Sequence, residues 1–128
     1  MDFGAALIDW CPEAEAAMVA ANATPYDVAL WRDQLTRDEV QLWRFTGGSD
    51  GYLLTRIEAT ADDARELVLI AGAGVNVRPV LRWVRELAER HGFNSIRTHI
   101  KRPGLQRIYE ALGWHLSERV MRVNIHGR

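Results

Sequence analysis

The sequence predicts an α/β domain with a mixed central sheet, in which an antiparallel hairpin side joins a strand-helix-strand crossover and helices flank the sheet. Residues 66–70 form an apolar run without polar alternation, which is typical of a central strand covered on both faces. An amphipathic helix and a second strand at 95–100 follow this run. Upstream, alternating segments at 40–45 and 52–59 flank a glycine-rich turn, which indicates a β-hairpin.

The chain of 128 residues suits one domain over 1–128, and its 48% hydrophobic residues suffice for a single core. We expect a helical part at 1–36, antiparallel strands at 37–75, and helix, strand, helix and strand at 76–128. Pro12 with acidic neighbours, and Thr24 before Pro25, indicate the starts of two early helices. Residues 5–10 fit either a short first strand or a helical turn.

The crossover has clear start and stop signals. Residues 71–74, Ala-Gly-Ala-Gly, predict that the central strand breaks there. Gly92 marks the end of the helix that follows, and Pro103 and Gly113 delimit a second, shorter helix. In the longer helix the apolar residues recur at helical spacing and comprise Val77, Val80, Leu81, Val84, Leu87 and Ala88. A last strand is predicted at about 114–125.

Composition excludes several classes of function. The formal net charge of -1 provides no basic field for nucleic-acid binding, so a nucleic-acid partner is not expected. The single Cys11 excludes an internal disulfide, and no Cys and His residues have zinc-like spacing. We expect a soluble, cytoplasmic protein with neither a secretion signal nor a membrane-spanning segment.

Residues 102–114, Arg-Pro-Gly-Leu-Gln-Arg-Ile-Tyr-Glu-Ala-Leu-Gly-Trp, resemble the N-x-x-A-x-x-L-Y-x-x-L-G-F signature of the GNAT superfamily of acyl-CoA-dependent N-acyltransferases. The order of the predicted elements resembles the GNAT fold over most of the chain. Two positions depart from the family pattern. Arg102 stands where the family usually has Asn, and residues 71–76 are shorter than its Q/R-x-x-G-x-G/A pyrophosphate loop.

The resemblance implies acetyl-CoA or another acyl-CoA as co-substrate and a small-molecule or protein amine as acceptor. It places the cofactor between the splayed central strand and its neighbour, against Ile70, Gly72, Gly74, Val75, Asn76 and Arg102. A Gly-x-Gly before a helix can present backbone N–H groups to a phosphate at the positive end of the helix dipole. The same residues also fit a plain tight turn, and Arg102 with Lys101 also fits an ordinary exposed pair of cations.

Tyr109 occupies the position at which the family often keeps a tyrosine as general acid. A phenol titrates near ~10, so Tyr109 would keep its proton at neutral pH and could donate it to the departing thiolate. The alternative is a core residue, because Tyr109 lies on the apolar stripe of its helix. For a general base the candidates are His99, Glu66 and Glu58. The alternative for His99 is a buried, hydrogen-bonded structural histidine. The alternative for Glu66 and Glu58 is a solvated position at the end of a strand.

Three functions fit these residues. The first is an acyl-CoA-dependent N-acyltransferase. The second is a catalytically inactive GNAT-like scaffold, similar to small internal virion proteins of tailed phages with the same decayed loop, which would place the protein in a virion as part of a larger particle or a homo-oligomer. The third is a transferase acting on nucleic acid, which the charge disfavours. Trp31 and Trp83, at the edges of their helical stripes, are candidates for an interface or for the cover of a substrate cleft.

Overall fold

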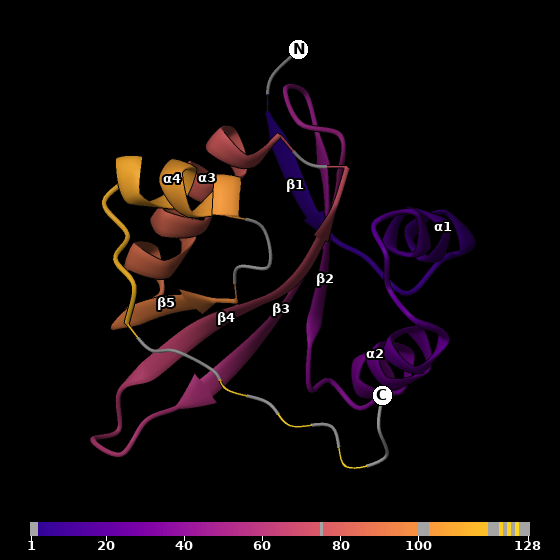
Figure 1. Cartoon of the computed structure of the whole chain (residues 1–128), viewed down its shortest axis with the longest axis horizontal. Helices are drawn as coiled ribbons and strands as arrows, with labels where there is room; N and C mark the ends of the chain where they lie inside the picture. The colour runs from indigo at the N-terminus through magenta and orange to yellow at the C-terminus, as the bar shows by residue number, and fades with distance from the viewer. Residues whose placement is uncertain are drawn as a thin grey trace.

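A five-stranded sheet separates two layers of helices in the computed structural model of the chain, which describes residues 3–74, 76–99 and 103–117 together with positions 121, 123 and 125 (Figure 1). The strands lie in chain order and are β1 (Gly4–Leu7), β2 (Gln41–Thr46), β3 (Gly51–Ala59), β4 (Arg65–Ala73) and β5 (Ser95–Thr98). Neighbours are antiparallel from β1 to β4, and β4 and β5 are parallel. The predicted α/β fold with a mixed sheet is confirmed.

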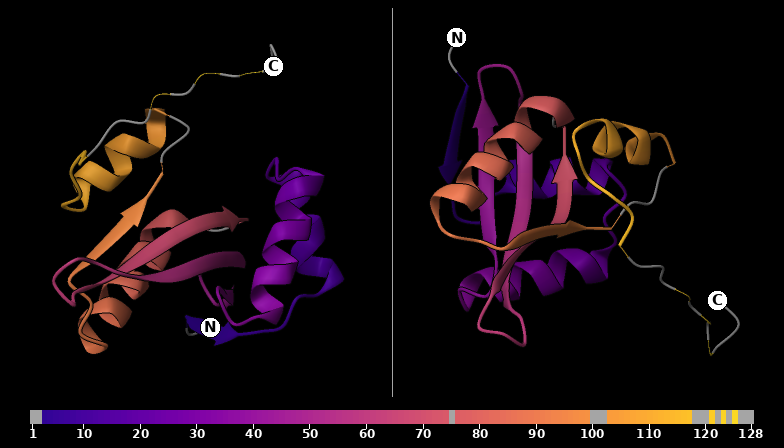
Figure 2. Two further views of the ribbon diagram at one scale, coloured as in Figure 1. Left: turned by 90° about the horizontal axis from the view of Figure 1, so that it is seen from below. Right: turned by 90° about the vertical axis from the view of Figure 1, so that its left-hand side faces the viewer.

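The helices lie on both faces of the sheet (Figure 2). Helices α1 (Pro12–Ala20) and α2 (Pro25–Thr36) cover one face. Helices α3 (Val77–Arg90) and α4 (Pro103–Ala111) cover the other, and α3 connects the parallel strands β4 and β5. None of the described helices is both long and apolar enough to cross a bilayer.

Local signals in the sequence explain most of the boundaries. Thr24 begins α2 with a capping box, because its Oγ1 accepts from the Asp27 N–H at 3.1 Å and the Asp27 carboxylate accepts from the Thr24 N–H at 3.0 Å. Gly92, with φ of +73°, follows α3 in the left-handed conformation that glycine adopts most easily. Residues 5–10 fit either a strand or a helical turn in the sequence. The first of them belong to strand β1, because they pair with β2.

Each face of the sheet has its own core. The buried residues beneath α1 and α2 are Ala14, Met18, Val40, Leu42, Tyr52, Leu54 and Ala73. Those beneath α3 are Phe45, Leu53, Leu67, Leu69, Val80, Leu81, Val84 and Ala88. Strand β4 supplies residues to both cores, as its uninterrupted apolar run predicts.

Three predicted boundaries are wrong. Strand β4 does not break at 71–74 but continues to Ala73, because β3 pairs with it as far as Tyr52↔Ala73 and this pairing outweighs the weak strand preference of glycine. Strand β5 ends at Thr98, and His99 lies outside it. Residues 114–117 and positions 121, 123 and 125 are not strand, whereas the rest of the predicted last strand lies outside the described residues.

Leu54→Ala should lower the free energy of unfolding by about 2–5 kcal/mol, because Leu54 is completely buried between β3 and the α1–α2 layer and alanine would leave a cavity. Urea unfolding followed by tryptophan fluorescence measures this change. Leu7→Ala is the matched control, because Leu7 on β1 is 60% exposed and its truncation should change the free energy of unfolding by less than about 0.5 kcal/mol. Equal losses for the two variants would contradict the burial of Leu54 and the exposure of Leu7.

Candidate functional site

Strand β5 is shorter than β4, and all four of its residues pair with the first half of β4. Their register runs from Glu66↔Ser95 to Leu69↔Thr98, yet β4 continues to Ala73. On the other side of β4, Leu54 pairs with Ala71 and Thr55 pairs with Leu69, so Ile70 is the extra residue of a β-bulge. A bulge bends its strand and increases its twist. Within the described residues, β4 therefore has no partner on β5 over 70–73, and we call this opening the β4–β5 fork.

Tyr109 on α4 lies at the point where the β4–β5 fork opens. Its phenol shares a hydrogen bond with the side chain of Thr98, the last residue of β5. The Thr98 hydroxyl in turn donates to the Leu69 carbonyl at 3.4 Å, which links the last residue pair before the fork to the phenol. Trp114 meets the Tyr109 ring edge-on, with 5.0 Å between the ring centroids.

Burial raises the pKa of Tyr109 above its ordinary value, and the hydrogen bond with Thr98 acts in the opposite direction without cancelling it. Tyr109 is therefore a neutral phenol with an available proton at physiological pH. Tyr109 also packs against the core beneath α3. Its position is therefore compatible both with a core residue and with a proton donor.

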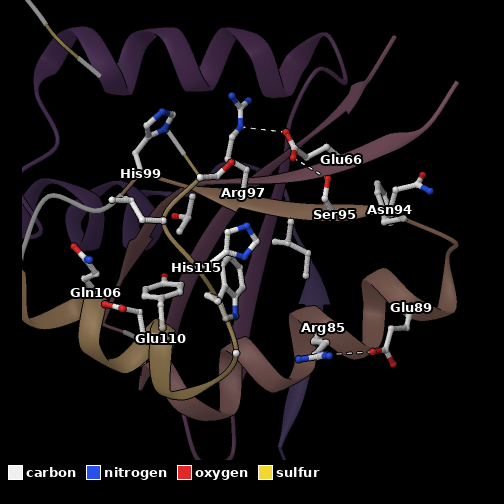
Figure 3. A pocket seen from close by; sticks show the side chains of 18 residues that line it. Glu66, Arg85, Glu89, Asn94, Ser95, Arg97, His99, Gln106, Glu110 and His115 are labelled. Carbon is white, nitrogen blue, oxygen red and sulfur yellow. Dashed lines mark hydrogen bonds and ion pairs between the residues drawn. The ribbon is translucent and has the colours of Figure 1, made fainter. Parts of the chain in front are cut away.

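A cavity of about 790 Å³ lies between β5, α4, the end of α3 and residues 113–117 (Figure 3). Tyr109, His99 and Glu66, the three residues that the sequence singles out for catalysis, all line it. His99 is exposed, so the interpretation as a buried structural histidine is wrong; it is exposed because β5 ends one residue earlier. The structure thus brings the predicted catalytic residues to one cavity.

Glu66 and Glu58 are ion-paired and are not the solvated strand ends that the sequence suggests. Glu66 accepts from the Ser95 hydroxyl at 2.8 Å, and one of its oxygens lies 3.3 Å from Arg97 Nε. Arg97 also donates to Glu58 at 2.5 Å, and Arg56 donates to the other Glu58 oxygen at 2.8 Å. This network joins β3, β4 and β5 at the paired end, opposite to the β4–β5 fork.

The glycine turn between β4 and α3 lies against the β2–β3 loop. Gly74 has φ of +70°, and a Cβ at this position would approach the Asp50 carbonyl oxygen to 3.0 Å, so glycine is required on both counts. The Asn76 N–H at the start of α3 donates to the hydroxyl of Ser49 at 2.7 Å, and Ser49 is only 4% exposed. One of the backbone donors expected to face a phosphate is therefore already bonded to the protein.

The other predicted cofactor residues are distributed around this turn. Ile70 lies at the bulge, and Gly72 is exposed on β4 beyond the end of β5. Val75 and Arg102 lie outside the described residues. Because Pro79 has no N–H, the first turn of α3 can offer the amides of Val77 and Arg78.

Sequence reasoning missed Ser49 and Thr98. Ser49 is 27 positions from Asn76, and a serine in a glycine-rich turn gives no local sign of a contact with a distant helix. Thr98 reads as an ordinary strand residue, and only the pairing register shows that it ends β5. No group of three or more His, Cys, Asp or Glu side chains that could hold a metal ion occurs in the described part of the chain.

No protein-family model matches the chain, and no curated protein sequence matches it. Solved structures match it over nearly their whole length. The ribosomal-protein-alanine N-acetyltransferase from Brucella melitensis biovar Abortus 2308 has a TM-score of 0.66 at 13% identity, with 95% of this chain and 100% of that chain covered. The glucosamine-6-phosphate N-acetyltransferase from Arabidopsis thaliana has a TM-score of 0.64 at 9% identity, with 98% and 99% covered.

A third match is AAC(6')-Iy in complex with the bisubstrate analog CoA-S-monomethyl-acetylneamine, with a TM-score of 0.67 at 12% identity and coverage of 97% of this chain and 98% of that chain. At such identities the likeness is one of fold. The chain therefore has a GNAT-like fold, as its sequence predicts.

The raised pKa of Tyr109 should appear in an alkaline titration. Phenolate absorbance lost in Tyr109→Phe should develop at higher pH than the absorbance lost in Tyr26→Phe, because burial raises the pKa of Tyr109 whereas Tyr26 is 74% exposed. Since the folded pKa exceeds the unfolded one, the stability contributed by neutral Tyr109 is complete below ~10 and declines as the pH rises further. Equal midpoints for the two tyrosines would contradict the buried position of Tyr109.

Proposed function

We propose that the protein is an N-acyltransferase that transfers an acetyl or other acyl group from acyl-CoA to an amine. The observation that supports this most directly is the position of a neutral phenol, Tyr109, at the β4–β5 fork. A thioester placed there would have a proton donor beside its sulfur. The fold shared with acetyltransferases over the whole chain supports the same function.

The open edge of β4 suits the long arm of CoA. Strand residues 70–73 present backbone N–H and C=O groups that no described residue of β5 pairs with. The arm of CoA contains two amides in an extended chain, so it can bind such an edge as an added strand would. Ile70 and Gly72 would lie along the arm, and Gly74 would lie at the turn beyond them.

The pyrophosphate would lie at the N-terminus of α3, where the helix dipole favours negative charge. Asn76, Val77 and Arg78 would surround it, with Val75 and Arg102 as further contacts predicted from the sequence. Because Ser49 already accepts from the Asn76 N–H, we assign the phosphate contacts to the remaining amides and to the Arg78 cation.

In the reaction, the amine nitrogen forms a bond to the thioester carbonyl carbon and the carbon–sulfur bond breaks. The departing thiolate takes the proton of Tyr109, and the attacking amine gives up a proton. His99 is one candidate base, because it is exposed, follows Thr98 directly and lines the same cavity as Tyr109. Glu66 is the second candidate, although Ser95 and Arg97 already engage its carboxylate at the far end of the cavity.

Titration calorimetry with acetyl-CoA tests the cofactor site directly. We expect binding with a dissociation constant in the micromolar range, which corresponds to about -8 kcal/mol. Absence of binding at millimolar cofactor would overturn the proposal and leave the catalytically inactive scaffold as the function to pursue.

Tyr109→Phe should slow turnover by roughly ten- to a thousand-fold while acetyl-CoA affinity stays unchanged, because only the proton donor is removed. Release of the CoA thiol in the presence of a panel of primary amines measures turnover. Tyr26→Phe is the control, since Tyr26 is exposed on α2, and should keep the wild-type rate. An unchanged rate in Tyr109→Phe would remove Tyr109 from the mechanism.

A further inference from the structure

The side chain of Thr98 joins two groups at the end of β5. Its hydroxyl donates to the Leu69 carbonyl at 3.4 Å and shares a hydrogen bond with the phenol of Tyr109. A carbonyl oxygen only accepts hydrogen bonds, so the hydroxyl hydrogen of Thr98 points to Leu69. The Tyr109 hydroxyl is then the donor in its bond with Thr98. The proton that the proposed reaction needs is thereby held by Thr98 Oγ1.

The bond between Thr98 and Leu69 is long. O–H···O hydrogen bonds in proteins usually span about 2.5–3.0 Å, so a separation of 3.4 Å makes this bond a weak one. A hydroxyl held so weakly turns about its C–O bond at little cost. A hydrogen bond to an ionised oxygen is shorter and about twice as strong as one between neutral groups. Thr98 can therefore accept from the Tyr109 phenol and, once Tyr109 is ionised, donate to the phenolate.

Other contacts fix the ring of Tyr109. Trp114 meets the ring edge-on with 5.0 Å between the ring centroids, and the N–H groups of Leu112 and Trp114 both donate to the Tyr109 carbonyl at 3.0 Å. Tyr109 also packs against the core beneath α3. These contacts keep the ring in place without Thr98, whose hydroxyl acts on the phenolic oxygen.

We propose that Thr98 is a positioning residue for Tyr109: it holds the phenol proton before acyl transfer, and it turns its own hydroxyl from the Leu69 carbonyl to the phenolate once that proton has moved to the thiolate. In this step the O–H bond of Tyr109 breaks and an S–H bond forms, while the Thr98 proton stays on its own oxygen. The phenolate then regains a proton from solvent water. This role rests on the proposed acyltransferase function, whereas the bond between the two side chains does not.

Charged side chains also surround the cavity that Tyr109 lines. They come from β4, α3, β5, α4 and the residues that follow β5 and α4, and they are Glu66, Arg85, Glu89, Arg97, His99, Glu110 and His115. The causes of the pKa shift of Tyr109 are its burial, which raises the pKa, and the hydrogen bond with Thr98, which lowers it. The polar group that acts on the pKa of Tyr109 is therefore the Thr98 hydroxyl.

Alkaline titration of Thr98→Val tests the bond between the two side chains without a substrate. Valine keeps the shape of threonine but has no donor for the phenolate, so the pKa of Tyr109 should rise and its phenolate absorbance should develop at higher pH than in the wild type. Thr98→Ser keeps the hydroxyl and should keep the wild-type midpoint. The absorbance of Tyr109 is isolated in each case by subtraction of a matched protein that also carries Tyr109→Phe.

Steady-state kinetics with acetyl-CoA and an amine test the role in transfer. Thr98→Val should lower kcat by roughly ten- to a hundredfold, because a hydrogen bond to a charged oxygen is lost, while the KM for acetyl-CoA stays unchanged. In a Tyr109→Phe background the same substitution should cause no further loss, because Thr98 then has no phenol to act on. Thr98→Ser should recover most of the rate.

Thr60→Val is the matched control, since the Thr60 hydroxyl donates to the Ala64 carbonyl at 3.2 Å in the connection between β3 and β4. It removes the same kind of bond and should leave both the Tyr109 midpoint and kcat at their wild-type values. An unchanged Tyr109 midpoint in Thr98→Val would overturn the proposal, as would a raised midpoint with an unchanged kcat, or equal losses in Thr98→Ser and Thr98→Val. A wild type without turnover and a raised midpoint in Thr98→Val would overturn the acyltransferase function, and with it the role in transfer, while the bond between Thr98 and Tyr109 would stand.

Discussion

The end of the β4–β5 pairing after four residue pairs, while β4 continues, is the constraint on which the rest of the structure depends. At the paired end, Leu67 and Leu69 pack beneath α3, and a slip of one residue would turn them away from that core. Arg97 lies between Glu58 and Glu66 across the same strands. These partly exposed ion pairs contribute about 1 kcal/mol or less each, so burial of the leucines holds the strands and the charges help to fix their register.

Beyond Leu69 strand β4 continues without a partner on β5 and carries the bulge at Ile70, and the elements of the candidate site lie around this opening. Tyr109 contacts Thr98 where the β4–β5 pairing ends, and α3 begins shortly after the end of β4. The β2–β3 loop fixes the start of α3, because the Ser49 hydroxyl accepts from Asn76 while the Asn76 side chain makes no capping bond. This hydrogen bond stabilises the turn but leaves fewer backbone donors for a phosphate. The shortened loop at 71–76 is therefore held by the protein itself and offers fewer N–H groups to a cofactor.

Local signals in the sequence predict the hairpin, the crossover helix and the capping box at Thr24, because the residues that determine them are neighbours in the chain. The end of β4 depends on its pairing with β3, and the end of β5 on its pairing with β4, so the sequence places both ends wrongly and with them the environment of His99. Contacts such as that of Ser49 with Asn76 join distant segments, and no periodic pattern in the sequence predicts them. Apolar alternation near the C-terminus predicts a strand, but alternation provides no partner, and the described positions there are not strand. Tyr109, His99 and Glu66 do line one cavity, because α4, the residue after β5 and the start of β4 all border it.

The backbone amides of β4 report on the β4–β5 fork most directly. In an isotope-labelled sample titrated with acetyl-CoA, the resonances of Ile70, Gly72 and Gly74 should shift because the cofactor arm binds along this edge. The amides of Leu67 and Val68, which lie in the stretch paired with both β3 and β5, should stay in place. Equal shifts along all of β4, or no shift over 70–74 at millimolar acetyl-CoA, would contradict the account.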